Sequence, residues 1–213
     1  MKSVLFGLLL ALATSAQGSV LTLTPGPKNI EGVNAAAGGT VSLQGQAIAL
    51  QPICAALRWK PVLVAKINAY VGQILATDAS KFIRNESQAI DSLDQSNTVV
   101  FHYTMLRDVD SATLVKSFRD GLAANRIDQN APHIQALIAA VAGVGDISNK
   151  QTMWAAVRKN AGGSETLFFE NQKGLLSQIE GPAGFSRHMI SIWLGTPADK
   201  GVAAFKATCI AGN

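Results

Sequence analysis

Residues 58–75 constrain the fold of this chain more than any other stretch. After Pro61 the stretch alternates as a β-strand does, because side chains two residues apart lie on the same face of a strand. One predicted face is entirely apolar, and it consists of Leu63, Ala65, Ile67, Ala69 and Val71. The alternation therefore predicts a strand with one face in a hydrophobic core.

The opposite face of this predicted strand is polar. Lys66, Asn68 and Tyr70 would stand in a row along it, and Arg58 enters just before them. A core strand does not need such a row, whereas a strand that forms the wall of a cleft with a polar end does. The alternative is a surface ion pair for Arg58, a solvated Lys66 and a Tyr70 at the edge of the core. On spacing alone, this alternative is the simpler interpretation.

The composition is that of one globular domain with a substantial core. The chain has 213 residues, of which 48% are hydrophobic and 15% are charged, and its mean hydropathy is +0.21. Such a composition is not typical of a disordered chain. The pI of about 9.2 reflects scattered basic residues without a block or an aromatic ladder. We therefore expect no nucleic-acid partner.

The N-terminus reads as a secretory signal peptide over residues 1–18, followed by a single domain over residues 19–213. Lys2 supplies the positive charge, residues 4–13 are an apolar run, and small residues follow it. The run is too short to span a bilayer, which needs about 20 residues. We expect a periplasmic or secreted protein without a stable membrane span; the alternative for this segment is a buried N-terminal helix.

The two cysteines, Cys54 and Cys209, suit either a disulfide or two buried thiols. In an exported protein an even number of cysteines permits a bridge. Such a bridge would connect the start of the organising stretch to the last predicted helix.

The remaining patterns predict an α+β fold, in which a large antiparallel sheet carries a layer of helices on one face. Residues 19–23, 40–43, 47–50, 99–106, 165–170 and 175–180 read as strands. Gly38-Gly39 is expected to open a hairpin whose turn is Gln44-Gly45-Gln46. Helices are expected at 111–125, 130–143, 185–194 and 199–210. Residues 150–160 read as a third helix of the middle region, although a strand also fits part of them.

Several kinds of chemistry have no matching motif. The sequence contains neither a Gly-rich phosphate loop nor a Gly-x-Ser-x-Gly elbow. His102, His133 and His188 lie far apart, without the spacing of metal ligands. We therefore expect no metal and no cofactor.

The remaining candidate for chemistry is Arg58, whose planar guanidinium can hold a carboxylate through two hydrogen bonds. An apolar cavity behind it would suit a fatty acid or a phenolic compound.

Four stretches follow one another in the order of a known family. They are residues 41–58, 66–75, 102–122 and 185–199, the last of which contains Ile192-Trp193-Leu194-Gly195. Together they resemble the chalcone isomerase-like proteins, in their bacterial exported branch. The resemblance implies an open-faced β-sandwich that encloses a cleft. Within this family, plant members cyclise chalcones, and fatty-acid-binding members hold a carboxylate with an arginine and a tyrosine.

The resemblance assigns site residues one by one. Arg58 matches the family arginine, and Tyr70 falls near the tyrosine of the fatty-acid binders. Asn68 and Ala69 are alternatives at that position, because the strand has one residue more than the family pattern. This extra residue indicates a β-bulge.

The positions of the catalytic members are only partly matched. Their tyrosine, lysine and asparagine correspond to Thr113, Lys116 and Asp120, and a late hydroxyl residue falls near Ile192 and Ser191. The short side chain of Thr113 lacks the reach of a phenol, and Asp120 adds a negative charge near an anionic substrate. Chalcone cyclisation is therefore not expected, and the simplest role for Thr113 and Lys116 is an exposed helix face.

The preferred hypothesis is a non-catalytic binder of a small apolar acid, either a fatty acid or a phenolic compound, in a cleft beside Arg58. Its ligand-binding residues would be Arg58, Tyr70, Asn68 and Lys66. Whether the protein is an enzyme stays open: an isomerase or intramolecular lyase on a small phenolic or acyl compound is one alternative. An envelope interaction protein with a filled, vestigial cleft is another. The sequence does not indicate an oligomeric state.

Overall fold

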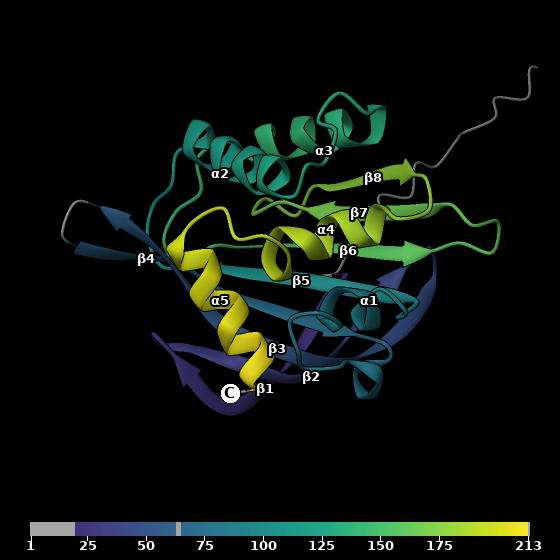
Figure 1. The fold of residues 1–213 in the computed structure, drawn as a ribbon, viewed down its shortest axis with the longest axis horizontal. Helices are drawn as coiled ribbons and strands as arrows, with labels where there is room; N and C mark the ends of the chain where they lie inside the picture. Colours follow the sequence, from purple (N-terminus) through teal and green to yellow (C-terminus); the bar gives the residue numbers. More distant parts are fainter. Residues whose placement is uncertain (1–19, 63–64, 213) are drawn as a thin grey trace, which may run out of the picture.

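The computed structural model of the protein describes residues 20–62 and 65–212. In this part of the chain, eight strands form one antiparallel sheet in chain order (Figure 1). They are β1 (Leu21–Ile30), β2 (Val33–Leu43), β3 (Gln46–Val62), β4 (Ala65–Ala76), β5 (Thr98–Met105), β6 (Thr152–Lys159), β7 (Glu165–Glu170) and β8 (Leu176–Gly181). The predicted signal peptide lies outside the described residues.

Most helices lie on one side of this sheet (Figure 1). They are the 3-10 turn η1 (Ala79–Lys81) and the helices α1 (Ala89–Leu93), α2 (Ser111–Ala124), α3 (Pro132–Ala142), α4 (Phe185–Leu194) and α5 (Lys200–Ala211). α5, drawn in yellow, lies along β3, and α2 and α3 form a pair at the other end of the layer. None of the helices in the described residues is long and apolar enough to cross a membrane. The predicted α+β class is confirmed.

The sheet has a hydrophobic core on each face. Phe101 on β5 and Trp193 on α4 belong to the core under the helices. Val41 on β2 packs in a second cluster with Trp154 on β6 and Phe168 on β7, which are not its neighbours in strand order. The sheet therefore curls so that its first strands cover the face away from the helices. This arrangement is an open-faced sandwich.

Residues 58–75 form a hairpin, in which the strand expected after Pro61 is β4. Arg58 lies near the end of β3, β4 begins at Ala65, and the two strands run antiparallel. Residues 63 and 64, which belong to the predicted apolar face, lie outside the described residues. In the register of the hairpin, Arg58 is opposite Tyr70. The hairpin therefore brings Arg58 closer to Tyr70 than their separation in the sequence suggests.

A β-bulge interrupts this hairpin directly beside Arg58. Arg58 pairs with Tyr70 and Trp59 pairs with Asn68, so Ala69 is an extra residue on β4. An extra residue reverses the faces of all residues that precede it on the strand. Lys66 and Asn68 therefore do not share a face with Tyr70, and the expected polar row does not form.

One further expectation from the sequence was wrong, and another was right about a turn but not about where its first strand begins. The stretch 150–160 contains β6 rather than a helix, because this strand is buried on both faces and its near-continuous apolar run hides the alternation. Gly38 and Gly39 lie inside β2, which begins at Val33 and therefore before the expected strand, whereas the hairpin turn comes at Gln44 and Gly45 as expected. Both turn residues have positive φ, 50° and 77°, as a two-residue turn of the primed type requires.

Candidate functional site

A cavity of about 370 Å³ lies between the sheet and the helical layer. Its apolar wall combines side chains of β5, β6 and β7 with side chains of α2, α3 and α4. The apolar and aromatic lining residues are Ile67, Ala69, Tyr70, Tyr103, Met105, Val109, Leu114, Phe118, Leu137, Val141, Met153, Ala155, Phe169, Met189, Ile192, Trp193, Ala198 and Val202. The volume falls in the range of roughly 300–1,000 Å³ that is usual for small-molecule sites.

The helical side of the cavity follows from the spacing of apolar residues on α2. Leu114 and Phe118 are one turn apart, so they project from the same face of the helix. The N-cap Asp110 starts this helix by accepting the backbone N–H of Thr113 at 2.7 Å. This cap fixes where the apolar face begins, at the mouth of the cavity.

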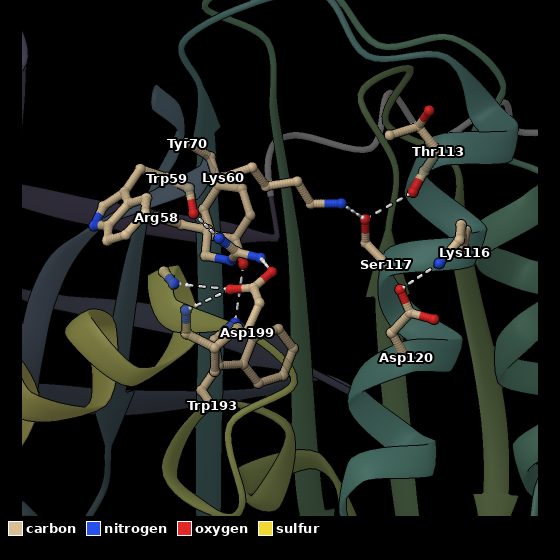
Figure 2. A network of polar contacts seen from close by, with 12 residues as sticks. Arg58, Trp59, Lys60, Tyr70, Thr113, Lys116, Ser117, Asp120, Trp193 and Asp199 are labelled. Atoms are coloured by element: carbon tan, nitrogen blue, oxygen red, sulfur yellow. Dashed lines mark hydrogen bonds and ion pairs between the residues drawn. The ribbon is translucent and has the colours of Figure 1, made fainter. Parts of the chain in front are cut away.

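Arg58 forms the polar end of the cavity together with Asp199 (Figure 2). Its Nη2 atom donates to Asp199 Oδ2 at 2.5 Å, and its Nη1 atom donates to the backbone carbonyl of Trp59. Arg58 is 4% exposed, whereas the side chain of Asp199 is 29% exposed. A buried guanidinium needs such a counter-ion, because an unpaired charge in the interior is strongly unfavourable.

Helix α5 brings Asp199 to this position. Asp199 is the N-cap of the helix, and its Oδ1 atom accepts the backbone N–H groups of Gly201 and Val202 at 2.9 and 3.0 Å. Gly201 permits the close approach, since a Cβ atom there would lie 1.7 Å from the carbonyl oxygen of Trp59. The start of α5 is therefore fitted against β3 with no room for a side chain.

The other end of α5 is attached to the same strand. Cys209 forms a disulfide with Cys54 on β3, so the two cysteines are not free thiols in the structure. Arg84 adds two hydrogen bonds, to the carbonyl oxygens of Cys209 at 2.6 Å and of Ile53 at 2.8 Å. With both ends held, α5 has little freedom to carry Asp199 away from Arg58.

The surroundings of Asp199 favour its charged form. Partial burial by itself raises the pKa of Asp199, but the hydrogen bonds from Arg58 and from the backbone of Val202 outweigh burial. The net result is a pKa below the usual value for an aspartate. At neutral pH, Arg58 and Asp199 therefore form a closed ion pair.

Tyr70 lies beside this pair and lines the cavity. Its hydroxyl oxygen accepts a hydrogen bond from Trp193 Nε1 at 3.1 Å. Burial raises the pKa of Tyr70, and the nearby charge of Arg58 offsets only part of the effect. The phenol is therefore protonated at neutral pH, and its O–H group can donate a hydrogen bond.

Tyr103 is the second tyrosine of the cavity wall. Its ring meets that of Tyr70 edge-on, with centroids 5.4 Å apart. The Tyr103 hydroxyl is buried and has no hydrogen-bond partner among the described residues. Burial raises the pKa of Tyr103 well above its usual value, so this hydroxyl also stays protonated. The Tyr103 hydroxyl is thus an unsatisfied polar group within the wall beside Tyr70.

Lys60 is a second cation at the polar end. It extends from β3 across to α2, where its Nζ atom donates to Ser117 Oγ at 2.5 Å (Figure 2). Ser117 Oγ in turn donates to the carbonyl oxygen of Thr113 at 2.8 Å. Burial, reinforced by the charge of Arg58, lowers the pKa of Lys60. Lys60 therefore connects the sheet to the helical layer beside Arg58.

The structure brings together only two of the four ligand-binding residues expected from the sequence. Arg58 and Tyr70 are cross-strand neighbours that both line the cavity. Asn68 lies by a separate depression, with residues of the β1–β2 turn. Lys66 is exposed and places its ammonium 4.7 Å from the ring centroid of Trp59. The bulge at Ala69 therefore separates Arg58 and Tyr70 from Asn68 and Lys66.

The positions that correspond to catalytic residues of the resembling family lie on α2. Thr113 lines the cavity, but its hydroxyl is hydrogen-bonded to Asp110 Oδ2 at 2.7 Å. Lys116 points outward and pairs with Asp120 at 2.8 Å (Figure 2). Lys116 is 75% exposed, so it belongs to the outer face of the helix.

Sequence reasoning missed Lys60, Asp199, Tyr103 and Trp193 as site residues. The signal for Lys60 was available, because it lies two residues from Arg58 on the same strand and points to the same side apart from local twist. The pairing of Asp199 with Arg58 spans 141 residues of sequence and gives no local signal. Among the described residues, no group of three or more metal-binding side chains comes together.

Comparison with known proteins places this geometry in a family. The family model described as chalcone isomerase-like matches residues 27–204, which is most of the chain, so the chain belongs to the chalcone isomerase-like family. The crystal structure of a fatty-acid binding protein of Arabidopsis thaliana has a similar fold, with a TM-score of 0.50 over 82% of this chain and 100% of that chain. The two sequences are 13% identical, so the similarity concerns the fold. The search of curated proteins found no match.

Proposed function

We propose that the protein is an exported, non-catalytic binder that holds a small apolar acid, a fatty acid or a phenolic compound, in the cavity beside Arg58. The observation that carries this proposal is the cavity of about 370 Å³, which has an apolar wall and gathers Arg58, Lys60 and Tyr70 at one end. An apolar space with a few polar groups at one end matches a ligand with a tail and a head group.

The fold supports binding of this kind. A fatty-acid binding protein shares the fold, and the chain belongs to the same broad family. An open cavity also argues against a filled, vestigial cleft.

Binding without catalysis is favoured by the side chains that are already engaged. The hydroxyl of Thr113 is committed to the cap of α2, and Lys116 faces solvent in an ion pair with Asp120. Neither can act as an acid or base on a molecule in the cavity, because a catalytic group must reach the reacting atom. Turnover of α,β-unsaturated ketones above the buffer rate would contradict this part of the proposal.

Export is supported by the disulfide between Cys54 and Cys209, because disulfides persist in oxidising compartments. The N-terminal sequence pattern of residues 1–18 is consistent with the same destination. Fractionation of expressing cells, with detection of the processed N-terminus by mass spectrometry, tests this. A full-length protein that stays in the cytosolic fraction would contradict it.

The binding proposal is tested by lipid extraction and native mass spectrometry of the protein expressed with its own N-terminus. We expect a co-purifying apolar acid, and we expect added fatty acid to raise the melting temperature. Ala155→Phe should abolish both effects, because Ala155 is 2% exposed and lines the cavity.

Ala139→Phe is the matched control. Ala139 lies on the exposed side of α3 and does not line the cavity. We expect this variant to bind as the wild type does. If Ala155→Phe, shown to be folded by circular dichroism, retains the ligand, the cavity is not the binding site.

A further inference from the structure

The two cations at the polar end of the cavity differ in whether the protein already neutralises them. Arg58 is 4% exposed and forms an ion pair with Asp199. Lys60 is half-buried, lines the cavity and forms no ion pair with any residue in the described part of the chain. An anionic head group entering the cavity thus meets Arg58, which is paired with Asp199, and Lys60, which has no ion-pair partner among the described residues and on which the charges of Asp199 and Asp120 act only through space. The carboxylates of Asp108, Asp110 and Asp120 also line the cavity, so the head group is expected to bind close to Lys60 and away from them.

Asp199 is not readily displaced by a ligand. Its carboxylate accepts from Arg58 and from two backbone N–H groups of α5, so moving it would break the ion pair and uncap the helix. The helix itself is fixed by the disulfide at Cys209 and by the contact of Gly201 with β3. A ligand carboxylate would have to replace these interactions to reach the paired side of Arg58.

Lys60, by contrast, has N–H donors that form no hydrogen bond within the described part of the protein. An ammonium group has three N–H donors, and one of them is used on Ser117 Oγ. Ser117 orients the ammonium, because its own hydroxyl is donated to the carbonyl oxygen of Thr113. Two donors of Lys60 remain for the two oxygens of a carboxylate.

We propose that Lys60, oriented by Ser117, is the residue that holds the anionic head group of the ligand, while Asp199 occupies Arg58 as a built-in counter-ion. The inference rests on the proposed function, since it assigns the head-group site of the same cavity. The ligand class that it predicts is a monocarboxylate with an apolar tail. Arg58 then holds Asp199 in place, and it does not determine the preference of the site for an acid.

Arg107 is the other cation among the lining residues. Its side chain is exposed, and a solvated charge at the mouth contributes little to affinity. It is therefore expected to affect how fast an acid enters more than how tightly it is held.

The experiment compares dodecanoate with dodecanol, which have the same tail and differ in charge, by isothermal titration of the full mature chain. We expect the wild type to prefer the acid. Lys60→Met should weaken acid binding by about tenfold or more, because a charge-assisted hydrogen bond is lost, and should leave dodecanol binding unchanged. Lys116→Met, the same substitution at a lysine outside the cavity, should retain the full preference for the acid.

A second variant separates the roles of the two cations. Asp199→Asn removes the internal counter-ion, so Arg58 becomes available, and in the Lys60→Met background this change should restore acid binding. An unaltered preference for the acid in Lys60→Met would overturn the inference, as would loss of the preference in Arg107→Met alone. If neither dodecanoate nor dodecanol binds the wild type, the proposed function fails, and the head-group assignment fails with it.

Discussion

Arg58 is held by the protein as a structural residue would be. Its guanidinium is buried, donates to the backbone of Trp59 and is neutralised by Asp199 at 2.5 Å. Breaking a buried ion pair by removing one partner costs more than the pair contributes, because the remaining charge is left without compensation. The stability of this corner therefore depends on Asp199 as much as on Arg58.

Asp199→Asn is expected to lower the free energy of unfolding by roughly 1.5–3 kcal/mol, the range for a hydrogen bond between charged groups. Asparagine still caps a helix well, so the loss reports the ion pair more than the cap. Chemical denaturation at pH 7 measures it. Asp91→Asn, which removes an exposed ion pair with Arg187, is the control and should change stability by less than about 1 kcal/mol.

The contribution of the Arg58–Asp199 pair should depend on pH. Because the pKa of Asp199 is lowered in the folded protein, the stabilisation is complete above the unfolded pKa of about 3.9 and is lost as pH falls through the folded value. The difference between the wild type and Asp199→Asn should therefore be constant at neutral pH and shrink in strong acid. A difference that grows on acidification would contradict the assignment.

His102 gives a second, separate dependence on pH. It lies on β5 opposite Gln73 and Trp154, and burial lowers its pKa from 6.5 to about 4. The neutral imidazole is favoured in the folded state, so stability is full above about pH 6.5 and falls between about 6.5 and 4. The shift corresponds to as much as about 3 kcal/mol.

His102→Gln should remove most of this loss, as measured by denaturation between pH 7 and 4. His133 and His188 have lowered pKa values, also because of burial, so a smaller loss should persist in the variant. The same slope in both proteins would mean that His102 does not titrate as its burial indicates.

At the scale of elements, the site depends on the close contact between the start of α5 and β3, where Gly201 lies against Trp59. Gly201→Ala is expected to destabilise the protein by about 1–3 kcal/mol or more, because the new Cβ atom would lie 1.7 Å from the Trp59 carbonyl oxygen. The melting temperature measures the effect. Gly162→Ala is the control, since nothing lies within 4 Å of a Cβ atom there, and it should be close to neutral.

Most elements could be predicted from the sequence, but β6, which is buried on both faces, was predicted as a helix. α4 spans Phe185–Leu194, as expected from its apolar stripe between Gly184 and Gly195. β6 carries Met153 and Ala155 toward the helices and Trp154 toward the other core, so its apolar run has no period that distinguishes strand from helix.

The candidate site was only partly predictable for a related reason. Arg58 and Tyr70 were chosen from the sequence, and the structure places both at the cavity. Their common face depends on a one-residue bulge, which also removes Lys66 and Asn68 from the site. Asp199 enters from a helix at the far end of the chain, and only the folded structure brings it to Arg58.

At the scale of the whole molecule, the disulfide joins residues separated by 155 positions. Closing a loop of this length restricts the unfolded chain by an amount equivalent to about 5 kcal/mol in the chain-entropy model. Reduction of the wild type should therefore lower its melting temperature strongly. The double variant Cys54→Ala/Cys209→Ala should melt near the reduced wild type and should not respond to a reductant.

Each strand of the sheet pairs with the strand before it, so the sheet can assemble in the order in which the chain is synthesised. β3 is completed only when the final helix is present, because Arg58 and Cys54 find their partners 141 and 155 residues further on. A chain interrupted before α5 would carry a free thiol at Cys54 and would leave Arg58 without its counter-ion. An incomplete chain differs from a complete one in these two features. Oxidative folding and proteolysis can therefore discriminate between the two on chemical grounds.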